Sequence, residues 1–247
     1  MKYIVELKYP GSFIVSQNPQ QQSQISRLLW AMESSFTDSI ISLILFEQNL
    51  HHFDEVDLQK KWFDRRNQLA EIEKEIKQTE FMNVDDITSR LLIGEKAKIL
   101  LMKREMENGK LPEVYQKRLK FIHAKSFLYS FHEIYQMLKT FKDEQGLTVN
   151  ATVAYDKFIS DFPNLNGVRN SSAHKNERIK ELSNKTYNEG INIISSECLY
   201  GNKFASTMRN GTTGEIEISI DSINKARDCI QMVIDSFQWK GFPMLVP

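Results

Sequence analysis

Apolar residues recur at three- and four-residue steps along most of this chain, a spacing that places them on one face of an α-helix. In residues 25–53 the pattern runs without a Pro or Gly, and it predicts one long helix. Residues 40–46 are apolar on nearly all sides, so we expect that part of the helix to be covered from more than one direction. The same periodicity predicts further helices at residues 111–142, 150–162 and 221–237, and the more polar residues 163–182 are also compatible with a helix.

The predicted helix at residues 111–142 has the densest aromatic content of the chain, and we expect it to be the central core helix. Core packing explains its Tyr129, Phe131 and Tyr135 better than base stacking does, because these residues recur at helical spacing.

Residues 54–108 have helical spacing too, but with a much higher density of charged side chains. A break is expected near residues 83–86, and Gly109 is a suitable helix end. The block therefore predicts a helical hairpin that is inserted between the core helices or packed on them. Its runs of charge are typical of solvated helix faces.

Short β-strands are predicted near the N-terminus, where apolar and polar residues alternate. Residues 2–7 form such a segment, which ends at Pro10-Gly11, and residues 12–16 are its expected partner. The Gln-rich residues 18–23 look like a linker between this β segment and the first helix.

A β-hairpin is predicted in the C-terminal part of the chain. Asn210-Gly211-Thr212-Thr213-Gly214 is a strong turn signal between two alternating segments, residues 203–209 and 215–220. Asp221 and Ser222 can cap the final helix that follows.

These elements predict a mainly α protein: an up-down helical bundle with a long helical insert, a small C-terminal β-hairpin followed by a final helix, and a short N-terminal β segment. We expect residues 1–22 to be the β segment and linker, residues 23–240 a single helical domain, and residues 241–247 a tail. Within the domain, residues 54–108 are the insert and residues 190–220 the hairpin region.

The charge balance restricts the classes of partner. Lys plus Arg and Asp plus Glu number 32 each, whereas proteins that coat nucleic acid are usually basic, so any nucleic-acid contact must be local. Two cysteines are too few for a disulfide scaffold. Glu6 and Lys8 interrupt any signal-peptide core, and no uncharged run approaches the length of a membrane span. We therefore expect a cytoplasmic protein without a membrane partner.

A polar run interrupts the apolar periodicity at residues 163–179. It places Arg169 five residues before His174, with Asn170 directly after the arginine. A guanidinium is always charged and binds phosphate through a planar fork, while an imidazole titrates near neutrality and can transfer protons. The pair predicts a site that binds and processes a phosphodiester. A five-residue step turns a straight helix by about 140°, so we expect the two side chains to converge across a two-fold dimer or at an irregular turn.

The same spacing occurs once more, between Arg118 and His123. There the intervening residues include Leu119 and Ile122, which fit the core face of the aromatic helix, so we interpret that match as coincidental. In the polar run the intervening residues are small and polar and leave room for a ligand. Gly167, just before them, permits close approach of another chain or a phosphate.

Basic residues surround the polar motif. Residues 163–185 hold five positive and two negative charges. Asn170, Ser171, Lys175 and Arg178 are therefore the residues expected to bind or position a substrate. The alternative is a purely structural role for the motif, through helix-end hydrogen bonds or a salt bridge to a nearby glutamate.

The ten residues Gly167-Val168-Arg169-Asn170-Ser171-Ser172-Ala173-His174-Lys175-Asn176 resemble the signature of HEPN domains, which is an Arg, a polar residue and a His four to six positions after the Arg. A long first helix, an aromatic-rich middle helix and a motif on a late helix are also similar to that family. The resemblance covers residues 23–53 and 111–185, and the insert and hairpin look like those of uncharacterised bacterial HEPN-like proteins.

The resemblance implies a function. Many HEPN proteins are metal-independent endoribonucleases that act as homodimers, some of them in toxin–antitoxin or defence systems. Carried over to this chain, His174 would move protons while a ribose 2′-OH attacks the adjacent phosphate. Arg169 would hold the phosphate and stabilise its growing charge, and Asn170 would position one of the two.

No cofactor or metal is expected, because the best histidine–acid cluster, His51 and His52 near Glu47 and Asp54, has no established metal-ligand spacing. The sequence also leaves open a non-enzymatic alternative, a helical module that binds a nucleotide or a protein partner through the same pocket or through the inserted helices. A third reading is a scaffold in which the hairpin at residues 54–108 mediates assembly.

Overall fold

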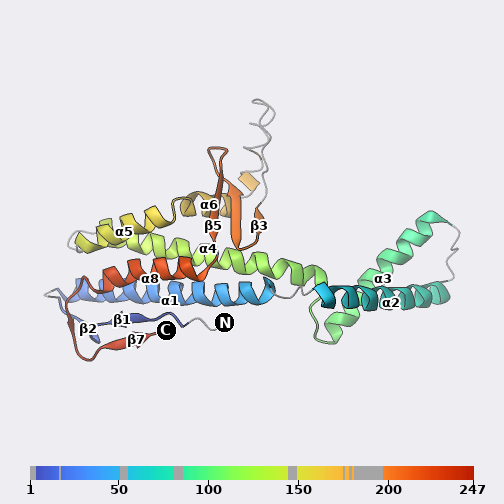
Figure 1. The fold of residues 1–247 in the computed structure, drawn as a ribbon, viewed down its shortest axis with the longest axis horizontal. Helices are drawn as coiled ribbons and strands as arrows, with labels where there is room; N and C mark the ends of the chain where they lie inside the picture. Colours follow the sequence, from blue (N-terminus) through green and yellow to red (C-terminus); the bar gives the residue numbers. More distant parts are fainter. Residues whose placement is uncertain are drawn as a thin grey trace. The chain divides into compact units, whose positions relative to one another are not determined.

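The computed structural model describes residues 4–16, 18–50, 55–80, 86–143, 149–174, 176–177, 180 and 197–247. Over these residues the protein is mainly helical and carries small antiparallel sheets (Figure 1), which confirms the predicted mainly α class. Contacts divide the chain into two compact units. We call Met1–Phe46 with Phe121–Pro247 the main unit and Glu47–Lys120 the hairpin unit.

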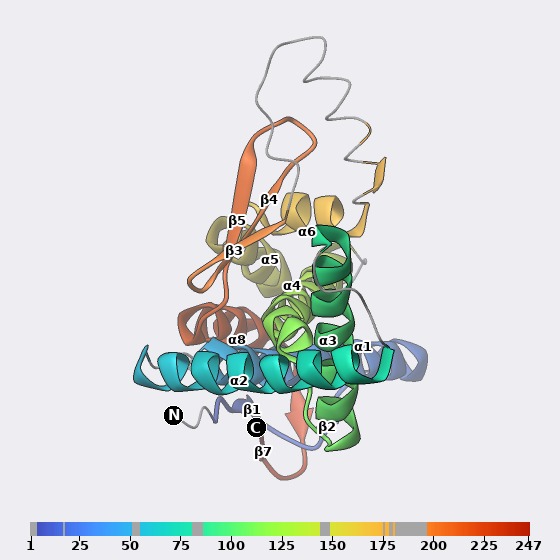
Figure 2. The same ribbon diagram turned by 90° about the vertical axis from the view of Figure 1, so that its right-hand side faces the viewer.

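The main unit is built on helices that lie side by side (Figures 1 and 2). They are α1 (Pro19–Leu50), α4 (Glu113–Asp143), α5 (Val149–Asp161) and α8 (Ile220–Ile234). Their apolar stripes form an aromatic core, in which the rings of Phe127 and Phe131 stack with centroids 4.3 Å apart. The largest side chains buried in this unit include Phe36, Phe46, Phe127, Phe131, Phe141, Phe158 and Phe204.

Helix α1 differs from the prediction at its start. The expected linker at residues 18–23 is the first part of the helix, because the Asn18 side chain accepts the Gln20 backbone N–H at 3.0 Å and Pro19 needs no helical donor. In residues 40–46, Ile40, Leu43 and Phe46 are buried while Ile41 is 48% exposed. By length and composition α1 could cross a membrane. One face of the helix, however, carries core residues such as Phe36, which is fully buried.

The N-terminal strands pair with the end of the chain and not with each other. β1 (Leu7–Tyr9) is antiparallel to β7 (Met244–Val246), and β2 (Phe13–Ile14) is antiparallel to β6 (Trp239–Lys240). The predicted pairing of residues 12–16 with the first strand was therefore wrong. The expected C-terminal tail contains β7.

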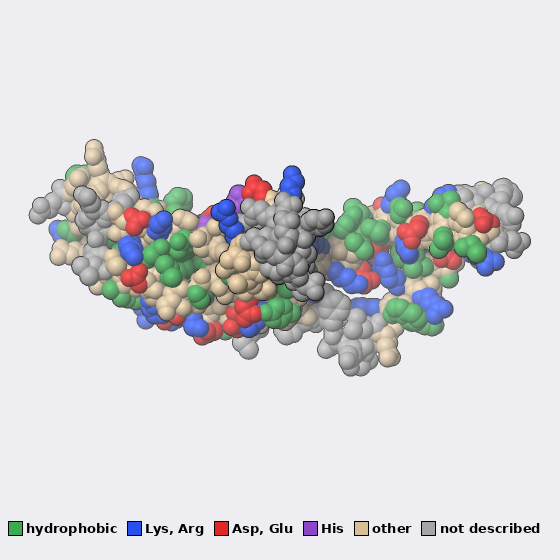
Figure 3. Space-filling view, turned by 90° about the horizontal axis from the view of Figure 1, so that it is seen from above, with side chains coloured by type: hydrophobic (Ala, Val, Ile, Leu, Met, Phe, Trp, Pro, Cys, Tyr) green, Lys and Arg blue, Asp and Glu red, His purple; other side chains and the backbone are tan. Residues whose placement is uncertain are grey.

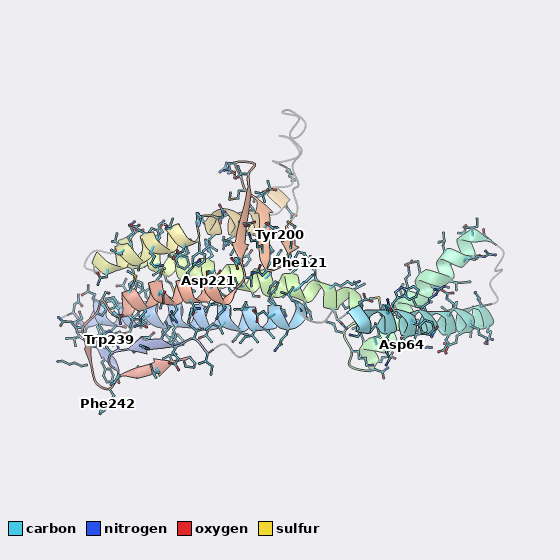
Figure 4. The ribbon with its side chains drawn as sticks, viewed as in Figure 1. Asp64, Phe121, Tyr200, Asp221, Trp239 and Phe242 are labelled. Atoms are coloured by element: carbon cyan, nitrogen blue, oxygen red, sulfur yellow. The ribbon has the colours of Figure 1, made fainter. Side chains whose placement is uncertain are left out.

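Side-chain contacts explain this pairing. The Gln231 side chain on α8 accepts the Lys8 backbone N–H at 2.9 Å and donates to the Lys8 carbonyl at 2.7 Å. Trp239, labelled in Figure 4, packs edge-on against Tyr9, and its indole N–H donates to the Ile234 carbonyl at 2.9 Å. The contacts of Lys8 with Gln231 and of Tyr9 with Trp239 join residues more than 200 positions apart, so no local sequence pattern predicts them.

The predicted C-terminal β-hairpin is present as β4 (Lys203–Thr207) and β5 (Thr213–Glu217), with Gly211 at φ 84 in the turn. β3 (Cys198–Tyr200) adds to β4, which gives the order β3-β4-β5. This sheet packs through β4 and β5 against the short helix α6 (Leu165–Ala173), as Figure 1 shows. The helix that follows the sheet is capped by Ser219, earlier than the predicted cap at residues 221–222.

The hairpin unit holds α2 (Glu55–Glu80) and α3 (Ile87–Glu107), as the sequence predicted. Asp86 caps α3 by accepting the Ser89 backbone N–H at 3.2 Å. The two helices pack through their own small apolar core, which consists of Ile72, Ile76, Ile93, Ala97 and Leu101. The unit therefore has an internal source of stability.

Candidate functional site

Helix α6 carries Arg169, Asn170 and Ser171 and ends at Ala173. Leu165 and Val168 are buried and fix the helix on the main unit. The predicted continuation of this helix toward residue 182 lies mostly outside the described residues.

Gly167 has a packing role that differs from the expected one. A Cβ at this position would collide with the Met208 side chain, which follows β4. A Cβ at Gly214 would meet the same Met208 sulfur at 2.8 Å. The small residues therefore let Met208 fit between α6 and the sheet. The space at Gly167 is filled from within the chain by the Met208 side chain.

Arg169 lies half-buried above an aromatic ring of α4. Its guanidinium carbon is 5.3 Å from the centre of the Tyr129 ring, and its Nη1 donates to the Asn170 side-chain oxygen at 3.3 Å. Its Nε is buried without a hydrogen-bond partner. No carboxylate among the described residues pairs with this guanidinium, so its charge is oriented but not neutralised.

A chain of polar side chains leads from Arg169 to a buried histidine on α4. Asn170 Nδ2 donates to Asn166 Oδ1 at 3.2 Å, and that same oxygen lies 3.3 Å from His132 Nε2. Gln136 Nε2 lies 3.3 Å from the same ring nitrogen. Asn166 Oδ1 is an acceptor, so a hydrogen bond to it requires the neutral tautomer with a proton on His132 Nε2, and the Gln136 amide nitrogen, which only donates, then makes no hydrogen bond to that ring nitrogen.

His132 was not among the residues that the sequence singled out. It lies on the buried face of α4. Burial lowers the pKa of His132 below its ordinary value, and the positive charge of Arg169 lowers that pKa further. The available signal was a histidine placed at helical spacing within the apolar stripe of a core helix. The network makes His132 a support for the Asn166–Asn170–Arg169 side chains.

His174 lies at the exposed end of α6, as its C-cap residue. Its backbone N–H donates to the Asn170 carbonyl at 3.0 Å, and its Nδ1 is 3.4 Å from Glu177 Oε2. The side chain is 51% exposed. No hydrogen bond or ion pair between the described atoms joins it to Arg169. The two motif residues therefore occupy one short helix and its cap without direct contact inside one chain.

Of the remaining residues predicted to bind or position a substrate, the structure describes only Ser171. Ser171 is buried, and its hydroxyl has no hydrogen-bond partner among the described atoms. Its neighbour Ser172 donates to Glu197 Oε1 at 2.7 Å, and Lys125 Nζ is 2.6 Å from the same oxygen. Lys175 and Arg178, and most of the expected basic surroundings, lie outside the described residues.

Figure 3 looks down on the upper side of the ribbon in Figure 1, and histidine side chains appear there beside basic and acidic ones.

The motif spacing also occurs between Arg118 and His123, and there the predicted core position of Ile122 is wrong. Ile122 is 50% exposed and does not belong to the core, because the buried face of α4 begins only at Ala124. Burial lowers the pKa of His123.

A hollow with a volume of about 1280 Å³ belongs to the hairpin unit, and Asp64, labelled in Figure 4, is one of the residues that line it. It contains no residue of the predicted motif. Arg65 there lies 2.8 Å from Glu105 and 3.6 Å from Glu113, so its charge is neutralised within the protein. This hollow is therefore separate from the residues whose chemistry suits a phosphodiester.

No group of three or more His, Cys, Asp or Glu side chains in the described part of the chain is arranged to hold a metal ion. His51 and His52 fall outside that part. Comparison with protein-family models, with curated proteins and with solved structures found no match for this chain.

Proposed function

We propose that the protein is a HEPN-like, metal-independent endoribonuclease that acts as a cytoplasmic homodimer, with Arg169 and His174 as its catalytic pair. The observation that carries this proposal is the Arg169 guanidinium, held over Tyr129 and bonded to Asn170 without a described acidic partner. A toxin or defence role is part of the same proposal, because it comes with the family resemblance.

The state of Arg169 supports an anionic ligand. A charged group that is removed from water without a partner costs free energy, and an incoming phosphate offsets that cost. Three other described arginines are neutralised locally: Arg65, Arg104 and Arg227 each lie within 2.8 Å of a carboxylate oxygen. Arg169 differs from them because the groups that orient it are an aromatic face and an amide. Both hold a cation in place and leave its charge available.

The proposed reaction needs two proton transfers. A base removes the proton of the ribose 2′-OH, the 2′-oxygen forms a bond to phosphorus, and an acid protonates the departing 5′-oxygen. Arg169 stabilises the negative charge that grows on the non-bridging phosphate oxygens. His174 is exposed and accessible to RNA, and a homodimer would supply a second copy so that one imidazole acts as base and the other as acid. Asn170 holds the guanidinium in orientation.

The test is cleavage of single-stranded RNA in the presence of a chelator, with wild type, Arg169→Ala and His174→Ala. Arg118→Ala and His123→Ala are matched controls, since they have the same spacing on α4. We expect a loss of at least a hundredfold in rate for the first two variants and little change for the controls. Cleavage that survives both Arg169→Ala and His174→Ala would remove this pair from the mechanism.

The separation of the two motif residues favours a second candidate, a non-catalytic module that binds RNA or a nucleotide through Arg169. Under that alternative RNA binds but stays intact in every buffer. Arg169→Ala then weakens binding strongly, while His174→Ala leaves it nearly unchanged. Binding measured by fluorescence anisotropy, together with the cleavage assay, separates the two functions.

A further inference from the structure

Helix α3 has two apolar faces, and only one of them is used inside the hairpin unit. Ile93, Ala97 and Leu101 pack against α2 and are buried. A second row, formed by Leu92, Ile99 and Met106, is exposed by 47%, 54% and 58%.

The exposed row is continuous. Its members follow each other at seven-residue steps, which is two helical turns or about 10 Å per step. A repeat of seven drifts by only about 20° per step around a helix, so the three side chains form one line. By the same geometry, Leu92 and Ile93 differ by about 100° around the helix. Single exposed apolar residues are common, but a heptad row without a partner marks an interaction surface.

We infer that a second copy of this chain covers this row, with the two α3 helices antiparallel about a two-fold axis near Ile99. Such an axis brings Ile99 against its own copy and Leu92 against Met106 of the other copy, because both lie seven residues from Ile99. Glu95 and Lys103 lie four residues on either side of Ile99, so each carboxylate then faces an ammonium. The α3 surface is thus complementary to itself, which an isologous dimer requires.

The charges decide the direction of the pairing. A parallel arrangement would place Glu95 against Glu95 and Lys103 against Lys103, which is repulsive. Glu95 is bonded to Lys98 at 2.6 Å within the same helix, but both side chains are more than half exposed, so this pair is weak and exchangeable. The apolar row supplies the affinity and the charges supply the orientation. This contact is independent of the proposed ribonuclease site.

Cysteine crosslinking tests the geometry in the full chain with Cys198→Ser, which leaves the buried Cys229 as the remaining native thiol. Under mild oxidation, Ile99→Cys is expected to form a covalent dimer, because a two-fold axis brings that position close to itself. Leu92→Cys mixed with Met106→Cys is expected to give the mixed dimer in clear excess over Leu92→Cys alone. Efficient crosslinking of Leu92→Cys to itself would overturn the antiparallel arrangement.

Sedimentation equilibrium tests the affinity. We expect Ile99→Glu to raise the dissociation constant of the dimer at least tenfold, while Lys74→Glu, an exposed charge change on α2, has little effect. Both positions are on exposed helix surface, and circular dichroism verifies that the helices persist. A wild-type chain that stays monomeric up to high micromolar concentration would overturn the inference and leave the row to a different protein. Self-association that is unaltered by Ile99→Glu in both stoichiometry and dissociation constant would overturn it as well, whereas loss of the α3 contact alone leaves any dimer at the ribonuclease site in place.

Discussion

Arg169→Met should leave the stability of the main unit almost unchanged, although the arginine is half-buried and stacked on a ring. This expectation distinguishes an arginine that binds a ligand from an arginine that stabilises the fold. Methionine retains an apolar stem next to Tyr129 but has no charge and no donors. The variant therefore removes the electrostatic features of Arg169 and little of its packing.

The expected change in the free energy of unfolding follows from two contacts of Arg169 and from its one unpartnered nitrogen. The guanidinium lies 5.3 Å from the Tyr129 ring centre, an arrangement that contributes about 0.5–2 kcal/mol. The bond to Asn170 is long at 3.3 Å and contributes about 0.5–1.5 kcal/mol. Against these losses, the unpartnered buried Nε costs about 1–3 kcal/mol, and the methionine relieves it. The two sides nearly cancel, so we expect a net change of about 1 kcal/mol or less.

Lys125→Met is the matched control on the same unit. It removes the ammonium 2.6 Å from Glu197, whose side chain is only 4% exposed, so a buried carboxylate loses that ion pair. We expect a cost of about 3 kcal/mol. The contrast between the two variants is the quantity to measure.

Urea unfolding followed by tryptophan fluorescence measures both variants. In a Trp62→Phe background the remaining tryptophans, Trp30 and Trp239, belong to the main unit. A loss of more than about 3 kcal/mol in Arg169→Met would show that the arginine is structural and would refute the reasoning.

The same variants test the ligand. A short RNA at ten times its dissociation constant should stabilise the wild type by about 1.4 kcal/mol through mass action. It should not stabilise Arg169→Met. Equal stabilisation of both proteins would place the RNA elsewhere on the surface.

Three further predictions concern the supports of the site and the second unit. Gly167→Ala should destabilise the main unit by about 1 kcal/mol in urea unfolding, because the new methyl group collides with Met208, and Met208→Ala should suppress this cost in a double-mutant cycle. The pKa of His132 is lowered from its ordinary 6.5, so the unfolded chain binds a proton at this histidine more readily than the folded chain does. The free energy of unfolding, measured from pH 8 to 5, should therefore fall below about pH 6.5. His132→Gln should weaken this pH dependence. Ile93→Ala should cost the hairpin unit about 2–5 kcal/mol, seen as faster hydrogen exchange in residues 59–79 and 87–107, with the main unit unaffected.

Helix positions followed from the sequence because helical periodicity is a local property. The aromatic α4, the charged α2–α3 hairpin and the turn at Gly211 all lie where their patterns predicted. The pairing of β1 with β7 did not follow, since it depends on Gln231 and Trp239, which are distant in sequence. Strands of two or three residues carry too little alternation to identify a partner.

The candidate site was predicted only in part, for a similar reason. Arg169, Asn170 and His174 are close in sequence, so a short motif could single them out. Tyr129 and His132 lie about 40 residues earlier and meet α6 only through the fold. Tyr129 was expected to be core packing, whereas its ring also carries the Arg169 cation.

The chemistry of the RNA ends tests the central claim most directly. Wild-type protein is incubated with an end-labelled RNA in chelator, and the product termini are determined by mass spectrometry, with a 2′-deoxy substitution at the cleaved position as control. Attack by the 2′-oxygen predicts a 2′,3′-cyclic phosphate and a 5′-hydroxyl, no cleavage of the deoxy substrate, and no products from His174→Ala. Intact RNA, or products with a 3′-hydroxyl and a 5′-phosphate, would contradict the account.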